Sequence, residues 1–406
     1  MIDRTRPIGT GYLRKDGRKG IRDKVLVVYT VNCASAVARR IAEPFRGGAF
    51  DVDVVGCEGC RKNDLTAELL SNFVQHPNVG AVLCVGNGCE ALRAGDLAGQ
   101  ALASGRPAYS LDIQTCGGTE KSVRQGRRYL KELLGEKSAA SLRADLYLSE
   151  LTIGFECGGS DFTSGLAANP LVGAFSDYMV DAGATVMFEE MYEAIGLKKF
   201  LVGRAANASA AKELADTYDK YFRYAEHSGQ FSISPGNIKG GLTTIEEKSM
   251  GAVIKSGTRP IAGVVKLCRR PAAPGLWMMD AMEDSTDDCG FPVSNDASSM
   301  LLYASCGAHM TILTSGLGHV VNTPIIPTFK ITGNCDSYRR LRNDMDMDVS
   351  GLLNGSADLG RQTLDFVAEI SRVAGGKRTK GELLGRGDGV INYAVQFSQR
   401  SAGQGR

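Results

Sequence analysis

The stretch that decides the fold is "KVLVVYTVNCASAVARRIAEPF" (residues 24–45). Residues 24–31 are almost all apolar and rich in valine, which predicts a buried β-strand. Residues 33–45 carry apolar side chains at helical spacing, which predicts an amphipathic helix. An apolar strand followed at once by such a helix is typical of a parallel sheet that is covered by helices.

The same alternation continues along the next ninety residues. Apolar runs are each followed by a helical pattern, with strands expected at 52–60, 79–90 and 107–119 and helices at 64–77, 91–105 and 120–137. This order predicts a doubly wound parallel sheet. Because ligands bind beyond the carboxyl ends of such strands, the residues found there are candidates for a site, namely Cys33, Cys57, Cys60, Cys89, Glu90 and Cys116.

A polar stretch at 135–150 predicts a domain boundary, and further strand and helix patterns follow it. We therefore expect an α/β protein made of two Rossmann-like parallel-sheet units packed together. The expected organisation is an N-terminal extension at 1–20, a first α/β domain at 21–145 and a second, catalytic α/β domain at 146–406.

Composition narrows the class of function. Lys and Arg number 47 against 45 Asp and Glu, so the net charge of +2 indicates neither nucleic acid nor a membrane surface. The chain has no apolar run of the roughly 20 residues that span a bilayer, so we expect a cytoplasmic protein. Of the eleven cysteines, the four inside apolar segments (Cys33, Cys84, Cys268 and Cys306) are expected to pack as small core residues. The seven beside glycines and charges suit metal ligation or catalysis, and disulfides are not expected in that compartment.

The segment "IGFECGGSDFTSGLAANP" (153–170) places a thiol, a hydroxyl and carboxylates around a glycine pair. The expected strand stops at Gly158 and Gly159, and a helical pattern begins at Ser164. The free N–H groups of a helix start suit an anion. The alternative is an ordinary turn that is capped by Ser160 or Asp161.

The segment "SPGNIKGGLTTIEEKSMG" (234–251) is the densest polar motif. Asn237 and Lys239 lie in a glycine-rich loop that either contacts substrate or is only solvated. Thr243-x-x-Glu246 has the spacing of a capping box, which makes Glu246 structural. Glu247 and Lys248 remain candidates for the site, although acidic residues are common in an exposed first turn.

The segment "IPTFKITGNCDSY" (326–338) places Lys330 inside an apolar strand. Removal from water lowers the pKa of a lysine and makes it usable as a base or a carboxylate clamp. The alternative is a lysine at a solvated strand edge, which would have no role in a site. Asn334 follows at the end of that strand. The chain carries no Walker A or dinucleotide motif, so a nucleotide cofactor is not indicated.

Five segments of the chain together resemble one family, the altronate and galactarate dehydratases with their sulfolactate sulfo-lyase relatives. The segments are 11–34, 76–90, 156–177, 234–261 and 322–334. The resemblance implies a metal-dependent lyase that removes water from a sugar acid to give a 2-keto-3-deoxy acid. The alternatives are a sulfo-lyase that releases sulfite from sulfolactate, and a non-catalytic paralogue or scaffold, which the departures from the family's pattern at 279–296 and 314–324 suggest.

The resemblance and the motifs together give a set of expected site residues. The catalytic residues are Cys157, Asp161, Lys248 and Lys330. The substrate-binding residues are Gly158, Gly159, Ser160, Asn237, Lys239, Glu247 and Asn334. The metal ligands are Cys89, Glu90 and Cys157.

The same resemblance implies a cofactor and partners. Iron(II) is expected first and manganese or magnesium next, because thiolate ligands favour iron, and the number of cysteines would also permit an iron–sulfur cluster. The chain starts at the large-domain match without the small β-rich N-terminal domain of single-chain members. We therefore expect a small β-rich subunit in trans, or a site that is closed without one, within a homo-oligomer.

Overall fold

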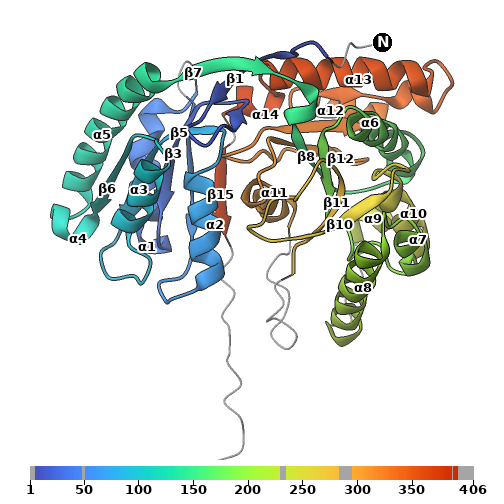
Figure 1. Ribbon diagram of the computed structural model, residues 1–406, viewed down its shortest axis with the longest axis horizontal. Coiled ribbons are helices and arrows are strands. Elements are labelled where there is room, and N and C mark those ends of the chain that lie inside the picture. The colour runs from blue at the N-terminus through green and yellow to red at the C-terminus, as the bar shows by residue number, and fades with distance from the viewer. Residues whose placement is uncertain (1–4, 48–50, 229–234, 283–294, 386, 392–406) are drawn as a thin grey trace, which may run out of the picture.

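The computed structural model describes residues 5–47, 51–228, 235–282, 295–385 and 387–391. Two parallel sheets, each flanked by helices, lie side by side (Figure 1). The expectation of an α/β protein with two packed parallel-sheet units is confirmed. No helix of the described chain is both long enough and apolar enough to cross a membrane.

The first sheet has the strand order β15-β4-β3-β5-β6, and all of its pairs are parallel. Its strands are β3 (Lys24–Tyr29), β4 (Val52–Cys57), β5 (Val79–Gly86), β6 (Ala108–Asp112) and β15 (Asp388–Ile391). The helices between them are α1 (Asn32–Ala42), α2 (Asp64–Val74), α3 (Ala94–Ala103), α4 (Ile113–Cys116) and α5 (Thr119–Ala140). Every residue of β3 is buried, and α1 buries Ala34, Val37, Ala38 and Ile41 at helical spacing, as the stretch 24–45 predicts.

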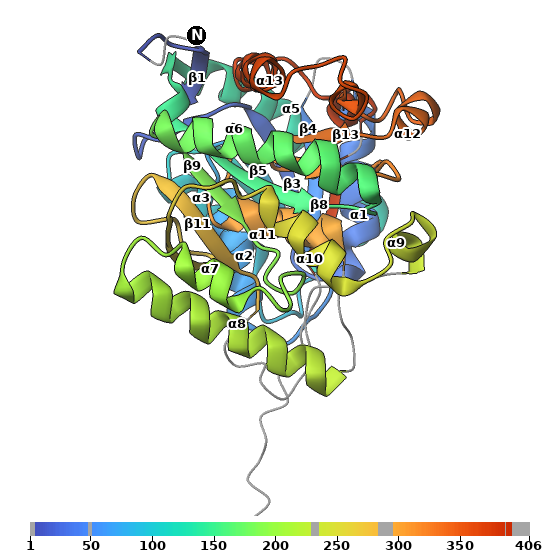
Figure 2. The same cartoon turned by 90° about the vertical axis from the view of Figure 1, so that its right-hand side faces the viewer.

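The second sheet has the order β10-β11-β9-β8-β12-β13-β14 and is also parallel throughout. Its strands are β8 (Thr152–Cys157), β9 (Thr185–Phe188), β10 (Ile261–Lys266), β11 (Gly275–Asp280), β12 (Met310–Thr314), β13 (Thr328–Thr332) and β14 (Met347–Asp348). Its helices are α6 (Asn169–Asp181), α7 (Lys198–Gly203), α8 (Ala208–Ser228), α9 (Pro235–Lys239), α10 (Ile245–Ile254), α11 (Asp296–Ser305), α12 (Cys335–Arg340), α13 (Leu359–Ala374) and α14 (Lys380–Leu383). Figure 2 shows α6 and α10 across the face of this unit, with α8 below them.

Residues 9–20, which lie in the expected N-terminal extension, form part of a third, antiparallel sheet. Strand β1 (Gly9–Leu13) pairs with β2 (Lys19–Gly20) on one side and with β7 (Leu142–Leu146) on the other. Strand β7 lies inside the polar stretch 135–150, so this stretch is not a simple linker. Short 3₁₀ turns complete the chain at η1 (Glu43–Phe45), η2 (Leu148–Glu150) and η5 (Ser350–Leu352).

The two parallel sheets share a hydrophobic core. Leu26 and Val28 of β3 belong to the same buried cluster as Leu301 and Tyr303 of α11 and Met279 of β11. A second cluster fills the space between the second sheet and α6 and α13, where the rings of Phe175 and Phe366 lie 4.7 Å apart. The units are therefore packed as one body, and the carboxyl edges of both sheets are fixed relative to each other.

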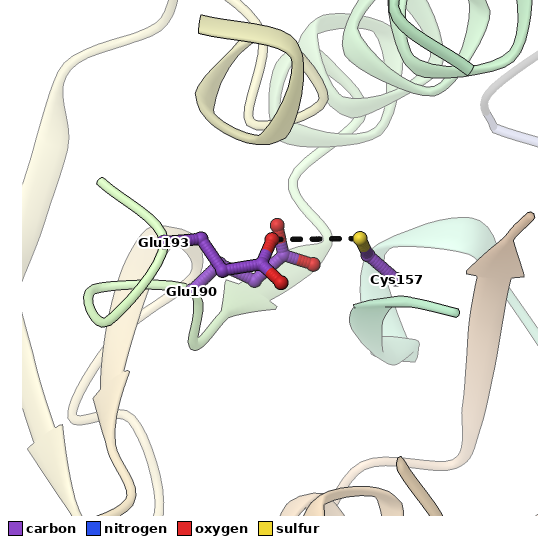
Figure 3. Close-up of side chains that lie close together, drawn as sticks. All are labelled: Cys157, Glu190 and Glu193. Carbon is purple, nitrogen blue, oxygen red and sulfur yellow. Dashed lines mark hydrogen bonds between the residues drawn. The ribbon is translucent and has the colours of Figure 1, made fainter. Parts of the chain in front are cut away.

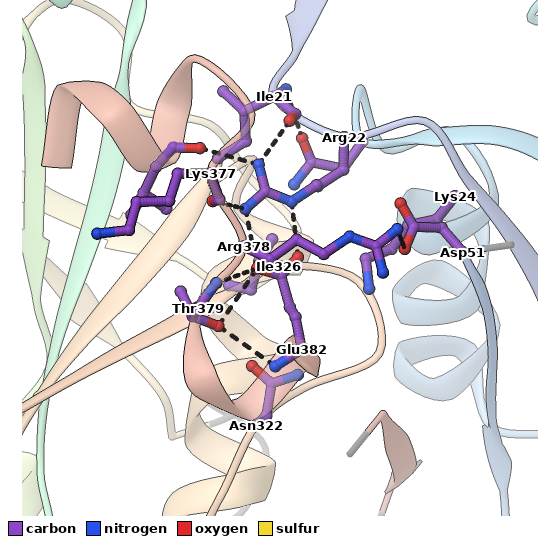
Figure 4. A network of polar contacts seen from close by, with 12 residues as sticks. Ile21, Arg22, Lys24, Asp51, Asn322, Ile326, Lys377, Arg378, Thr379 and Glu382 are labelled. Atoms are coloured by element: carbon purple, nitrogen blue, oxygen red, sulfur yellow. Dashed lines mark hydrogen bonds and ion pairs between the residues drawn. The ribbon is translucent and has the colours of Figure 1, made fainter. Parts of the chain in front are cut away.

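A buried ion pair ties the start of the first sheet to the segment that leads into β15 (Figure 4). Arg22 Nε lies 2.6 Å from Glu382 Oε1, and Arg22 Nη2 donates to Glu382 Oε2 at 2.8 Å. Arg22 also donates to the carbonyl oxygens of Val373 and Lys377. Both charged side chains are 4% exposed, so α14 is held firmly and β15 can add to β4.

Candidate active site

Buried acidic groups and a thiol meet at the carboxyl edge of the second sheet. Strand β8 ends at Glu156 and Cys157, and β9 is followed directly by Glu189 and Glu190. The neighbouring strand β11 ends at Asp280, which is fully buried. Because β11, β9 and β8 are adjacent and parallel, their carboxyl ends present these side chains at one edge.

The centre of this edge is a thiol–carboxylate cluster of Cys157, Glu190 and Glu193 (Figure 3). One ligand atom from each residue lies within 4.8 Å of the others. The Cys157 sulfur lies 3.4 Å from Glu193 Oε2, and Glu190 Oε2 has no hydrogen-bond partner among the described residues. One soft donor from the end of β8 and two hard donors from the turns after β9 suit a transition-metal ion.

Two lysines contact the thiol–carboxylate cluster. Lys248 of α10 places its Nζ 2.7 Å from Cys157 Sγ, 2.9 Å from Ser160 Oγ and 3.0 Å from Glu193 Oε2. Lys255 forms a buried ion pair with Glu190. Lys248 lies in α10, and Lys255 is the residue that follows it. Because positions seven apart lie on one face of a helix, both ammonium groups can reach the same cluster.

The pKa values of the two lysines are shifted in opposite directions. Burial alone would lower the pKa of Lys248, but the charges of Cys157 and Glu193 outweigh it and raise that pKa above its usual range. Burial prevails at Lys255, and its pKa is lowered. Lys248 is therefore a permanent cation at neutral pH, whereas the neutral amine of Lys255 is more accessible than that of an ordinary lysine.

Two further carboxyl groups lie behind the cluster. Burial, followed by the charge of Glu193, raises the pKa of Glu189 to about 8. Burial and the charges of Glu189 and Asp296 raise the pKa of Glu156 well above its usual range. Glu189 therefore holds a proton at neutral pH, so the edge carries a proton donor beside its cations.

The glycine pair Gly158-Gly159 leads into a turn that Asp161 closes. The Asp161 carboxylate accepts hydrogen bonds from Thr163 N at 2.9 Å, Thr163 Oγ1 at 2.6 Å and Ser164 N at 3.1 Å. Its second oxygen accepts from Asn334 Nδ2 at 2.9 Å. Asp161 thus caps the helical segment that follows, through η3 (Ser164–Ala168) into α6, and its carboxylate uses the N–H groups that an anion would need.

Several other expected residues support this turn. Buried Asn237 accepts from Ser160 N at 3.2 Å, and Asn334 caps α12 while it holds Asp161. Lys239 is exposed at the end of α9. These contacts connect α9 and β13 to the glycine pair.

The capping box expected at Thr243 and Glu246 lies one residue further along the chain. Thr244 is the N-cap of α10, and its hydroxyl accepts from Glu247 N. The Glu247 carboxylate reaches back to Thr243 N at 3.0 Å. The structural role assigned to Glu246 therefore belongs to Glu247. The reason is that α10 begins at Ile245, which makes Glu247 the third residue of the helix.

The described contacts of Lys330, Cys89 and Glu90 lie outside the thiol–carboxylate cluster. Lys330 is fully buried in β13, and its Nζ donates to Val321 O at 2.9 Å. Glu90 accepts from Thr30 Oγ1 and from three backbone N–H groups of its own loop, which outweigh burial and lower its pKa.

The three expected metal ligands are not brought together in the described part of the chain. Cys89 and Glu90 follow β5 of the first sheet, whereas Cys157 ends β8 of the second. The ligand group around Cys157 is completed by Glu190 and Glu193 instead. Expectation from sequence missed these two residues and Lys255. The signal was present, because "TVMFEE" (185–190) is an apolar run that ends in two acids, the same pattern of a strand end that identified Glu90.

A cavity of about 480 Å³ adjoins the cluster. Ser160, Asp161 and Lys248 contribute its polar wall. Its apolar rim, defined here as Phe162, Leu166, Met250 and Ile254, is 44–66% exposed. Ser160 and Lys248, which both contact the Cys157 sulfur, connect this cavity to the cluster, whose own three residues do not line it.

Comparison with known proteins agrees with this architecture. Residues 11–138 match the family model of the D-galactarate dehydratase/altronate hydrolase second domain, and residues 148–396 match that of the D-galactarate/altronate dehydratase C-terminal region. An altronate dehydratase of Escherichia coli is 30% identical over 91% of this chain and 74% of its own length. The (2R)-sulfolactate sulfo-lyase subunit beta of Chromohalobacter salexigens is 30% identical over 94% of this chain and 96% of its own length. A galactarate dehydratase of Escherichia coli is 29% identical over 76% of this chain and 59% of its own length. The match at 148–396 alone covers more than half of the chain and contains the whole thiol–carboxylate cluster, so this protein belongs to the D-galactarate/altronate dehydratase family.

Proposed function

We propose that this protein is a metal-dependent lyase that removes water from a sugar acid of the altronate or galactarate type and yields a 2-keto-3-deoxy acid. The observation that carries the proposal is the buried cluster of Cys157, Glu190 and Glu193 with Lys248 and Lys255 beside it. Dehydration of this kind needs a base for the proton next to the carboxylate, a positive group for the resulting enediolate and a proton for the leaving hydroxyl. The cluster and its neighbours offer a residue for each task.

The chain's own residues divide these tasks as follows. In its neutral amine form, which burial favours by lowering its pKa, Lys255 takes the proton from the carbon next to the carboxylate. Lys248 keeps its charge and stabilises the enediolate oxygens that form in the adjoining cavity. Glu189, with a pKa of about 8, holds a proton at neutral pH for the departing hydroxyl. Asp161 and Asn237 position the glycine turn and do not exchange protons.

The cluster also fits a bound divalent metal. Cys157, Glu190 and Glu193 supply one thiolate and two carboxylate donors, and Glu190 Oε2 lacks a hydrogen-bond partner within the described chain. A metal held by these residues would polarise the substrate's oxygen atoms as a Lewis acid. The mixed donor set favours iron(II) first, with manganese and magnesium after it. The ten described cysteines are all free, which agrees with a reducing compartment, and we place the reaction in the cytoplasm.

A second candidate function is the release of sulfite from sulfolactate. The similarity to the sulfo-lyase subunit reaches the same 30% identity and extends over nearly all of both chains. Both eliminations begin with loss of the proton next to a carboxylate, so the same lysines would serve either leaving group. A scaffold role is disfavoured because a non-catalytic protein gains little from several buried charges.

The experiment that tests the function is a product assay on protein purified and reconstituted with iron(II) without oxygen. Altronate, galactarate and sulfolactate are supplied separately, and 2-keto acid and sulfite are both measured. The proposal expects 2-keto acid from a sugar acid and no sulfite. Sulfite from sulfolactate alone would establish the second function instead, and neither product, with or without a partner, would establish a non-catalytic role.

We further propose that a small β-rich subunit completes the site in trans within a homo-oligomer. Two observations support it. The sulfo-lyase relative, which this chain matches over 96% of that protein's length, is itself named a subunit. In this chain the apolar rim surrounds the cavity that leads to Lys248. Exposed apolar side chains clustered at a cavity mouth are typical of a protein contact. Adding a small β-rich protein encoded nearby should raise turnover, and Leu166→Glu should abolish that increase; turnover that is unchanged by the addition would contradict this proposal.

A further inference from the structure

A second cavity lies at the opposite edge of the second sheet from Cys157. Its volume is about 280 Å³, and Thr152 and Thr185, the first residues of β8 and β9, line it. The hairpin between β1 and β2 contributes Arg18 and Lys19, and Arg270 closes another side. Strand β8 runs from this cavity to the thiol–carboxylate cluster, so the two sites occupy opposite ends of one strand.

Two of the three cations that line this cavity have acidic partners, and the third, Arg270, has none among the described residues. Glu150 is the one acidic side chain among the described residues that line it, and Lys19 already holds it at 2.6 Å. Arg18 pairs with Asp16 at 2.6 Å. Arg270 donates no hydrogen bond and forms no ion pair within the described part of the chain, although it lines the cavity.

The arginines also repel one another. Burial lowers the pKa of Arg270, and the charge of Arg18 lowers it further, while Asp16 acts in the opposite direction. Behind them, Arg106 is 3% exposed, and its described hydrogen bonds go to backbone carbonyls and to Ser104. Arg106 therefore adds positive potential to this side of the molecule with no carboxylate among its hydrogen-bond partners.

Neutral donors are available beside these charges. Thr152 and Thr185 are both partly buried. Within the part of the chain that the structure describes, their hydroxyl groups donate no hydrogen bond. His309 fixes the wall near them, because its Nδ1 accepts from Thr152 N at 2.9 Å and its Nε2 therefore donates to Lys19 O at 2.9 Å. Charged and neutral donors thus converge on a space that protein acids leave open.

We propose that this cavity binds a small dianion, either a phosphate or a dicarboxylate, through Arg270 and Arg18, with Thr152 and Thr185 as hydroxyl donors. Guanidinium groups bind carboxylate and phosphate oxygens in pairs, which gives a site with two arginines a preference for dianions over chloride.

The test is isothermal titration of the full chain with inorganic phosphate and, separately, with malonate, at an ionic strength held constant with sodium chloride. Arg270→Ala is compared with Arg269→Ala, because Arg269 is also exposed but pairs with Glu68. We expect saturable binding by the unmodified protein, a loss of at least about tenfold in affinity for Arg270→Ala, and no change for Arg269→Ala. Tighter binding of phosphate identifies a phosphoryl ligand, and tighter binding of malonate identifies a dicarboxylate.

A third variant separates this site from the candidate active site. Lys248→Met removes the cation of the other cavity and should leave dianion binding unchanged. Loss of binding in Lys248→Met with full binding in Arg270→Ala would overturn the proposal, as would no saturable binding of either probe to the unmodified protein. Thermal melting of each variant without ligand verifies folding, and Arg270→Gln replaces Arg270→Ala if the latter melts early.

Discussion

The Lys248 ammonium nitrogen lies 2.7 Å from the Cys157 sulfur, although the two residues are 91 positions apart in the chain. Strand β8 fixes the sulfur at the carboxyl edge of the second sheet, and α10 supplies the ammonium group. Both side chains are at most 5% exposed, so their interaction is little screened by solvent. This contact joins two motifs that the sequence shows as separate polar stretches.

Replacement of either partner should strongly reduce turnover. Cys157→Ala and Lys248→Met should each lower kcat by roughly a hundredfold or more, the usual scale for loss of an acid–base group or of a charge that stabilises the transition state. Lys212→Met is the matched control, because Lys212 is an exposed lysine of α8 that pairs only with the exposed Asp216 among the described contacts. Steady-state rates with a sugar acid are the measurement. Normal rates in Cys157→Ala and Lys248→Met would remove both residues from the site.

Metal content should follow the ligands of the second sheet. Elemental analysis after anaerobic reconstitution should give close to one iron per chain, and Glu190→Gln, Glu193→Gln and Cys157→Ser should each lower that content severalfold. Cys89→Ser should not change it, because Cys89 is an exposed thiol on the first sheet. A loss of iron in Cys89→Ser with none in Glu190→Gln would place the metal on the first sheet instead.

Asp161→Asn should act through stability and positioning. The carboxylate accepts hydrogen bonds from Thr163, Ser164 and Asn334, and an amide nitrogen at either oxygen would face a donor. We expect a loss of about 1–3 kcal/mol in the free energy of unfolding, together with reduced turnover but an unchanged pH–rate profile. Asp336→Asn, at an exposed position of α12, is the control for a carboxylate-to-amide change. A shifted pH–rate profile in Asp161→Asn would show that Asp161 exchanges protons during turnover.

Stability in acid should depend on the Arg22–Glu382 pair. Burial would raise the pKa of Glu382, but Arg22 outweighs it and lowers that pKa from its ordinary 4.5 to about 2. A carboxyl whose pKa is depressed in the folded state stabilises the fold above its unfolded pKa and loses that contribution as pH falls towards the folded value. The pair should therefore contribute on the order of 3 kcal/mol at neutral pH, and the contribution should disappear between about pH 4.5 and 2.

Chemical denaturation at several pH values measures this contribution. The unmodified protein should lose stability through that interval more steeply than Glu382→Gln, which should be less stable at pH 7 and closer to the unmodified protein near pH 2. Asp365→Asn is the control, because the Arg361–Asp365 pair is exposed on α13. Parallel pH profiles for the unmodified protein and Glu382→Gln would contradict this assignment.

Most of the strand and helix order could be predicted, because the long helices repeat apolar residues on one face and the inner strands are continuous apolar runs. The strands of the first sheet are nearly all apolar, and α1 and α2 repeat apolar residues every three or four positions. Strand β15 could not be predicted, because "DGVI" is a short run after glycines and becomes a strand only by pairing with β4 of the first sheet. Strand β7 could not be predicted either, because two of its five residues are charged and only its pairing with β1 makes it a strand.

The site was only partly predictable for a similar reason. Cys157, Ser160 and Lys248 lie in motifs with unusual composition, so the sequence alone predicts each of them as a site residue. Glu190 and Glu193 lie in the acidic stretch after β9, and nothing in the sequence says that β9 lies beside β8. The strand order of the sheet, set by crossover connections, decides that these carboxylates face Cys157 and that Glu90 does not.

The central claim is that the edge of β8 and β9, around Cys157 and Lys248, eliminates water from a sugar acid. The most direct measurement is the rate of 2-keto-3-deoxy acid formation from altronate and galactarate by iron-loaded protein, with the proposed subunit added where it is required. This rate is compared with the rates of Lys248→Met and Lys212→Met. The account predicts product from at least one of the two acids, a rate about a hundredfold lower in Lys248→Met and an unchanged rate in Lys212→Met. An equal rate of product formation in Lys248→Met and the unmodified protein would contradict it.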